Sequence, residues 1–233
     1  MNNIDFAINL KKIFPKIPDD FFAQINRYKL FLQKYNQKTN LTRLADENKI
    51  YSEYFYESIV PYKDFDFVKI QSLLDIGSGS GIPGIVLKLL YPYIQLTIIE
   101  SNNKKVTFLK ELCYHLKIKA TVLNQRAENI QNKQREQFDI VTCRAVASLP
   151  IIVELSLPYL KVNGLLIAPK SQKWIDEMSA SKNIIPAVGG KALPTYQFTS
   201  INHKFHAVIF IQKSKKTNHY YPRSWNLIVK DGK

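Results

Sequence analysis

Residues 73–84 read LLDIGSGSGIPG, in which an apolar run and an aspartate precede four of the chain's eight glycines. Gly77, Gly79, Gly81 and Gly84 fall within eight positions. Glycine adopts backbone conformations that other residues avoid, and it has no side chain to keep a neighbour away. We therefore expect a strand followed by a sharp turn at which the backbone lies close to a ligand.

Beyond this stretch, short apolar segments alternate with helical patterns. This order is typical of a parallel sheet with right-handed crossovers. A closing antiparallel hairpin is expected near the end of the chain. The predicted fold class is α/β, a Rossmann-like sheet that is mostly parallel. Strands are expected at 71–76, 95–100, 119–124, 138–143, 164–169, 195–201 and 205–213, and helices at 82–91, 104–117 and 148–160.

The first 70 residues have helical patterns instead. Phe22, Ile25, Tyr28, Leu32 and Tyr35 recur at helical spacing after Asp19, which is a suitable N-cap, and a second helix is expected over 46–61. The expected organisation is an N-terminal helical segment (1–70), a sheet domain (71–213) and a basic C-terminal tail (214–233).

The composition excludes several classes of protein. The chain has 233 residues, 45% of them hydrophobic, but it has no long apolar stretch and no signal-peptide pattern, which predicts a cytoplasmic protein without a membrane span. Cys113 and Cys143 form no CxxC and have no histidine pair nearby, so neither a disulfide nor a metal site is expected.

The formal charge of +14 is unevenly distributed. Residues 161–233 carry 12 Lys and Arg but only 3 Asp and Glu. Such an excess indicates a polyanionic partner, with nucleic acid favoured over membrane, and we expect Lys213, Lys215 and Lys216 to contact it. A solvated basic surface without a partner is the alternative.

The glycine turn indicates which nucleotide-like ligand binds. Ile82 occupies the position of the third glycine of a dinucleotide fingerprint, and no lysine follows the glycines before Lys88, as a P-loop requires. Glu100 ends the second strand, where it can accept hydrogen bonds from two ribose hydroxyls, although it could be merely a solvated carboxylate. Together these features favour S-adenosylmethionine over a nicotinamide dinucleotide. Asp75 either holds the ammonium group of the ligand or fixes the loop, and we favour the second role.

The segments after the third and fourth strands should complete the pocket. Ala127 and Glu128 are placed to cover an adenine. Arg126 and Arg144 stand at the mouth of the sheet, where arginines need anionic partners. Candidate partners are RNA phosphate, the ligand carboxylate, Glu128 and Glu100.

At these motifs the sequence resembles the RsmG (GidB) family. Bacterial methyltransferases of that family use S-adenosylmethionine to methylate N7 of one guanine in 16S (small-subunit) ribosomal RNA. The resemblance rests on DIGSGSGIPG (75–84), IIESNNKKVTFLK (98–110), QRAENI (125–130), FDIVTCRAVASL (138–149) and the upstream NLT (40–42).

The resemblance implies roles for particular residues. Cofactor contacts are implied at Gly77, Ile82, Glu100, Ala127, Glu128 and Arg144, and the glycine loop adds Gly79. Arg126 and Lys170 match basic positions on the RNA side, and the small ribosomal subunit is the implied partner of what we expect to be a monomer. The sequence departs from the family at Tyr54 and Glu57, where His-x-x-Asp is usual, and at Ser171, where glycine is usual.

The implied reaction needs no acid or base, because guanine N7 already presents a lone pair. Positioning should then dominate catalysis. The chain accordingly lacks the [DN]PP[YF] motif of amino-group methyltransferases and a cysteine preceded by proline. We expect Arg144 and Arg126 to orient the guanine or its phosphate. The alternatives are an RNA-binding module without turnover, or a methyltransferase acting on another RNA or on a small molecule.

Overall fold

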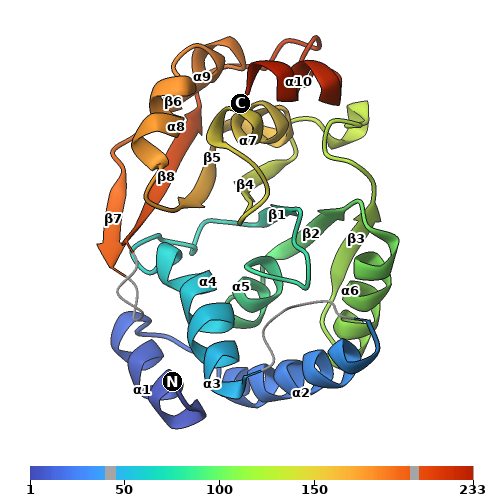
Figure 1. Cartoon of the computed structure of the whole chain (residues 1–233), viewed down its shortest axis with the longest axis vertical. Helices are drawn as coiled ribbons and strands as arrows, with labels where there is room; N and C mark the ends of the chain where they lie inside the picture. The colour runs from blue at the N-terminus through green and yellow to red at the C-terminus, as the bar shows by residue number, and fades with distance from the viewer. Residues whose placement is uncertain (40–45, 200–204, 233) are drawn as a thin grey trace.

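A twisted eight-stranded sheet organises the computed structural model, which describes residues 1–39, 46–199 and 205–232 (Figure 1). The strand order is β3-β2-β1-β4-β5-β8-β6, with β7 also paired to β8. The strands from β3 to β5 in this order are parallel, whereas β8 runs antiparallel to β5, β6 and β7. The bounds are β1 Ser72–Ile76, β2 Gln95–Glu100, β3 Ala120–Asn124, β4 Phe138–Thr142, β5 Leu160–Lys170, β6 Gly190–Ala192, β7 Tyr196–Thr199 and β8 Phe205–Lys213.

This topology confirms the predicted fold class. The antiparallel pairing of β7 with β8 confirms the expected hairpin, although its link and residues 200–201 lie outside the described residues. The short strand β6 was not predicted. The NLT motif at 40–42 also lies outside the described part of the chain.

The central strands of the sheet are buried on both faces, and their successive residues enter different cores. Leu73 of β1 belongs to a core shared with α5 (Gly84–Leu90) and α6 (Asn103–His115), while Leu74 belongs to a core shared with α7 (Leu149–Ser156). This alternation follows from the two-residue period of a strand. Two covered faces also explain why the central strands contain consecutive apolar residues, such as Leu73 and Leu74 in β1 or Ile140 and Val141 in β4.

The N-terminal helices enlarge the first core. They lie on the same side of the sheet as α5 and α6 (Figure 1). The expected helix at 46–61 forms a continuous helical stretch, but a π-helical segment, η1, interrupts its α-helical geometry. Such segments are frequent at functional sites. The elements are α1 Asn3–Ile13, α2 Phe21–Thr39, α3 Glu47–Lys49, η1 Ile50–Tyr56, α4 Glu57–Ile59 and the 3-10 turn η2 Val60–Tyr62.

The C-terminal part adds helices to the second core. The last helix, α10, packs beside α7 (Figure 1), and Ser148 donates a hydrogen bond to the carbonyl of Gly232. Arg223 holds this region through Glu154, with 2.7 Å between Nη2 and Oε2. The division of the chain at residues 70 and 213 stays a prediction. The remaining elements are η3 Asn132–Gln134, η4 Leu157–Tyr159, α8 Trp174–Ala180, α9 Ile184–Ala187 and α10 Trp225–Asp231.

The expectation for Lys213 is wrong. Its side chain is fully buried at the end of β8, where Nζ lies 2.9 Å from the carbonyl oxygen of Leu157 and 3.1 Å from Oε1 of Glu136. A buried lysine needs such partners to offset its desolvation. Lys213 therefore stabilises the fold and is not accessible to RNA, whereas Lys215 and Lys216 are exposed.

No described helix is long and apolar enough to cross a membrane.

Candidate active site

The glycine turn follows β1 at the carboxyl edge of the sheet. Gly77, Gly79 and Gly81 all have positive φ angles, of 67°, 63° and 104°. Asp75 fixes the turn, since its Oδ2 accepts hydrogen bonds from the Ser78 hydroxyl and from the backbone N–H of Gly84. The carboxyl is fully buried, and this burial raises its pKa to about 6. The geometry agrees with the loop-fixing role favoured from the sequence.

The glycines serve different purposes in the turn. A Cβ on Gly84 would lie 2.7 Å from Oδ2 of Asp75, and one on Gly81 would collide with Tyr28 and Ile85, so these two glycines permit packing within the protein. A Cβ on Gly79 would meet no described atom within 4 Å. Gly79 therefore borders open space that a ligand can fill.

Glu100 joins the end of β2 to this turn. Its Oε2 accepts a hydrogen bond from the N–H of Gly79 at 3.0 Å, and its Oε1 accepts one from the N–H of Asn102 at 2.9 Å. The residue is only 6% exposed. Because each carboxylate oxygen can accept more than one hydrogen bond, both oxygens retain capacity for a pair of hydroxyl donors.

A cavity of about 230 Å³ opens at the ends of β1, β2 and β3, and we call it the β1–β3 cavity. Five of the residues predicted to form the site line it. Gly79 and Ile82 are not among its lining residues: Gly79 is hydrogen-bonded to Glu100 in the wall, and Ile82 packs against the first core. Trp225 of α10 also lines this cavity, and nothing in the local sequence pattern indicated it. The predicted residues in the wall are Gly77, Glu100, Arg126, Ala127 and Glu128.

Arg126 has two partners at the rim of this cavity. Its Nε lies 2.6 Å from Oε1 of Glu128, and its guanidinium stacks on the Trp225 ring at 4.5 Å from the centroid. Pairing with Glu128 was one of the alternatives left open by the sequence. The Arg126 side chain remains 46% exposed, so it can still reach a phosphate from solvent.

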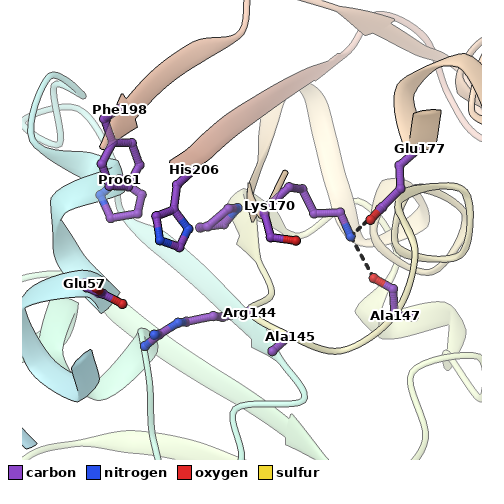
Figure 2. A pocket seen from close by; sticks show the side chains of 11 residues that line it. Glu57, Pro61, Arg144, Ala145, Ala147, Lys170, Glu177, Phe198 and His206 are labelled. Atoms are coloured by element: carbon purple, nitrogen blue, oxygen red, sulfur yellow. Dashed lines mark hydrogen bonds and ion pairs between the residues drawn. The ribbon is translucent and has the colours of Figure 1, made fainter. Parts of the chain in front are cut away.

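A second cavity, of about 360 Å³, lies beyond the ends of β4 and β5, and we call it the β4–β5 cavity (Figure 2). It brings together Arg144, two residues after the end of β4, and Lys170, the last residue of β5. Arg144, which the resemblance implied as a cofactor contact, does not line the β1–β3 cavity, so it is separated from Arg126. Lys170 is bound on one side, with Nζ 2.6 Å from Oε2 of Glu177 and 2.8 Å from the carbonyl of Ala147. The lining residues are Glu57, Pro61, Arg144, Ala145, Ala147, Pro169, Lys170, Ser171, Glu177, Phe198 and His206.

Arg144 reaches across this cavity to the N-terminal helices. It donates hydrogen bonds to the carbonyls of Glu53 and Tyr54 in η1, at 2.9 and 3.4 Å. Burial lowers the pKa of its guanidinium, and nearby groups, chiefly the carboxylate of Glu57, oppose this shift. The two backbone carbonyls of η1 thus fix the guanidinium of Arg144, and its further N–H groups remain available to a ligand.

Comparison with known proteins gives the family. The family model described as rRNA small subunit methyltransferase G (GidB) matches residues 22–205. The chain belongs to this family. It is 43% identical to the Ribosomal RNA small subunit methyltransferase G of Ureaplasma parvum serovar 3, over 99% of both chains, and 41% identical to that of Malacoplasma penetrans, over 100% of both. The match confirms the family predicted from the sequence motifs and makes the chain an rRNA methyltransferase.

Two solved structures share the fold of this chain. TYW2 of M. jannaschii, in complex with AdoMet, superposes with a TM-score of 0.53 at 16% identity, covering 67% of this chain and 76% of that chain. The methyltransferase described as StiE O-MT residues 942–1257 gives a TM-score of 0.54 at 12% identity, covering 74% and 76%. At these identities the likeness shows the fold alone.

One departure from the GidB family pattern has a structural reason. Tyr54, in place of histidine, donates a hydrogen bond to the carbonyl of Ser80 at 2.9 Å, and Tyr28 bonds the same carbonyl. Position 54 therefore ties η1 to the glycine turn while its own carbonyl holds Arg144. Burial raises the pKa of the Tyr54 hydroxyl to about 12, so it stays protonated at neutral pH.

Cys143 has no geometry for covalent chemistry. The residue is only 1% exposed, and burial raises the pKa of its thiol to about 12, so the nucleophilic thiolate is suppressed. Cys143 is therefore a small buried residue of the second core. The described residues also contain no group of three or more His, Cys, Asp or Glu that could hold a metal ion.

Proposed function

We propose that this chain transfers a methyl group from S-adenosylmethionine to N7 of a guanine in 16S ribosomal RNA. One structural observation carries the proposal beyond family membership: a single segment forms a wall of both cavities. Val146 lines the β1–β3 cavity, while Arg144, Ala145 and Ala147 line the β4–β5 cavity. A methyl donor and an acceptor base can therefore bind on either side of residues 144–147.

The β1–β3 cavity fits the adenosine part of the donor. Glu100 offers acceptors for two ribose hydroxyls, and Ala127 and Glu128 stand where the adenine and its amine would lie. Open space beside Gly79 leaves the turn accessible to the amino-acid end of the donor. The hydrogen-bonding groups and the open space of this cavity therefore match the adenosine part and the amino-acid end of the donor.

The donor supplies a methyl group on a sulfonium, and N7 attacks it while the carbon–sulfur bond breaks and its electron pair stays on sulfur. No proton moves in this step, and the guanine ring becomes cationic. The protein must then orient the base and exclude water. The buried hydroxyl of Tyr54 and thiol of Cys143 stay protonated and supply no base.

The β4–β5 cavity can hold a base turned out of the RNA. The rings of Phe198 and His206 stack on each other, with 5.3 Å between their centroids and an interplanar angle of 22°. Bases of single-stranded RNA commonly stack on such aromatic side chains. Arg144 points into the same space (Figure 2). We assign to it the orientation of the guanine, and to Arg126 and Lys170 positions along the RNA, which the excess of basic residues attracts.

The test is methyl transfer to small ribosomal subunits from a strain without this protein, using tritiated S-adenosylmethionine. We expect incorporation into 16S RNA, and chain cleavage at a single guanine after borohydride and aniline treatment, which cleaves at 7-methylguanosine. Label without cleavage would exclude N7. RNA binding without label would favour a binding module, and label only in small molecules would exclude an RNA substrate.

A further inference from the structure

Glu57 lines the β4–β5 cavity with a carboxylate that has one unpaired oxygen. It begins α4, directly after the π-helical segment, and its side chain faces the space that Arg144 enters (Figure 2). Its Oε1 is buried but accepts no hydrogen bond from any described residue. Leaving such an acceptor unpaired is costly, and more so when the group is charged. A ligand with N–H groups would relieve this cost.

We propose that Glu57 binds the Watson–Crick edge of the target guanine, accepting hydrogen bonds from N1–H and from the N2 amine. The inference rests on the proposed function and identifies the group that selects guanine. Guanine is the RNA base with two adjacent donors on that edge. Adenine and cytosine place an acceptor beside their amine, and uracil has one donor between two acceptors. A carboxylate only accepts, so it matches guanine and opposes the others.

The neighbours of Glu57 fit the rest of the base. Guanine O6 is an acceptor between N1 and N7, and Arg144 retains N–H groups beyond those bound to Glu53 and Tyr54. With N1 and N2 held by Glu57 and O6 by Arg144, the N7 edge is left free to face the donor. Phe198 and Pro61 line the same cavity and offer surfaces for the faces of the base.

The contact should also accelerate the reaction. As the methyl group is transferred, the ring gains positive charge, and its N1–H and N2 amine become stronger hydrogen-bond donors. The bonds to Glu57 are then stronger in the transition state than with the neutral base, and only such differential interactions raise the rate of the chemical step. Loss of the Glu57 charge should therefore lower the single-turnover rate more than it lowers RNA affinity.

The experiment combines a protein variant with an altered base. Small subunits are reconstituted with 16S RNA carrying guanosine or inosine at the mapped position; inosine lacks the N2 amine but keeps N1–H, O6 and N7. We expect wild-type protein to methylate the inosine substrate about 10- to 100-fold more slowly in a single turnover, as for a lost hydrogen bond to a charged group. The Glu57→Gln variant should be slow on guanosine and should show less than about a threefold further loss on inosine.

Two controls make the outcomes decisive. Glu111→Gln, at an exposed position of α6, should behave as wild type on both substrates. Glu57→Gln should bind adenosylhomocysteine normally, because Glu57 does not line the β1–β3 cavity. An equal inosine penalty in wild type and Glu57→Gln, or lost adenosylhomocysteine binding in the variant, would overturn the role of Glu57. Absence of 7-methylguanosine with wild-type protein would overturn the proposed function itself.

Discussion

The carboxylate of Glu100 accepts a hydrogen bond from the backbone N–H of Gly79, with 3.0 Å between the two heavy atoms. This bond ties the end of β2 to the turn after β1, so the acid expected to hold a ribose also shapes the glycine turn. A variant of Glu100 would disturb both functions together. The glycines offer a cleaner separation, because they border different surroundings.

Gly79→Ala should mainly lower the affinity for adenosylhomocysteine, whereas Gly84→Ala should mainly lower thermal stability. A methyl group at position 79 meets no described atom, so the variant should fold with a loss of about 1–2 kcal/mol from its positive φ, while adenosylhomocysteine affinity falls at least about tenfold. A methyl group at position 84 collides with Asp75 and should mainly lower thermal stability. Calorimetry and thermal unfolding measure the two effects. Full ligand affinity in Gly79→Ala would show that the ligand does not lie against this turn.

Asp75 should make stability depend on pH below neutrality. Its pKa is raised to about 6 by burial, from an ordinary value of 3.8, so between these pH values the folded protein holds a proton that the unfolded chain releases. The free energy of unfolding should therefore fall as pH rises from about 4 to 6, by up to about 3 kcal/mol from this group. Urea titrations across this range should show the slope, and Asp75→Asn should flatten it. An equal slope in the variant would assign it to other groups.

The sequence predicted those features that neighbouring residues determine. The strand before Gly77, the turn itself and Glu100 at the end of the next strand all follow from short patterns, because parallel strands place their carboxyl ends at one edge. The opposite walls of the cavities come from distant segments. Trp225 reaches the β1–β3 cavity because the C-terminal residues pack beside α7, and Glu57 faces Arg144 because η1 docks on the glycine turn. The prediction that Lys213 contacts RNA was wrong because lysines close in sequence can differ in burial: Lys213 is buried, whereas Lys215 and Lys216 are exposed.

Exposed lysines, not Lys213, should contribute to RNA binding. Replacing Lys215 and Lys216 by glutamine should weaken binding and reduce the slope of log affinity against log salt by about 1 per lysine. Lys213→Met should instead lower thermal stability, because it leaves Glu136 without its buried partner. Filter binding at several salt concentrations measures the slopes, with adenosylhomocysteine affinity as the control. Identical slopes for the double variant and wild type would mean that these lysines do not touch RNA.

Trp225 should report on cofactor binding. The chain has two tryptophans, and only Trp225 lines the β1–β3 cavity, whereas Trp174 packs against the second core. Adenosylhomocysteine should therefore alter the intrinsic fluorescence of wild type and of Trp174→Phe, but not that of Trp225→Phe. Titrations of the three proteins test this. A signal lost in Trp174→Phe and kept in Trp225→Phe would place the ligand elsewhere.

Arg144→Ala should slow methyl transfer more than it weakens RNA binding. The guanidinium spans the β4–β5 cavity, and the carbonyls of Glu53 and Tyr54 hold it in place, so its removal frees both the base and η1 to shift. A misplacement of about 1 Å between reacting atoms can lower a rate on the order of a hundredfold. We expect a single-turnover loss of that size at saturating donor, with RNA affinity changed less than about threefold.

The matched control for this variant is Arg27→Ala, which removes an exposed arginine from α2 and should leave the rate unchanged. Arg144→Lys should recover only part of the rate, because a single ammonium group cannot reproduce the planar fork that bonds two carbonyls and a base together. Rapid-quench measurements give the rates, and filter binding gives the affinities. A rate in Arg144→Ala equal to wild type would remove Arg144 from the reaction, whereas equal losses of rate and affinity would make it a binding residue without a specific role in the transition state.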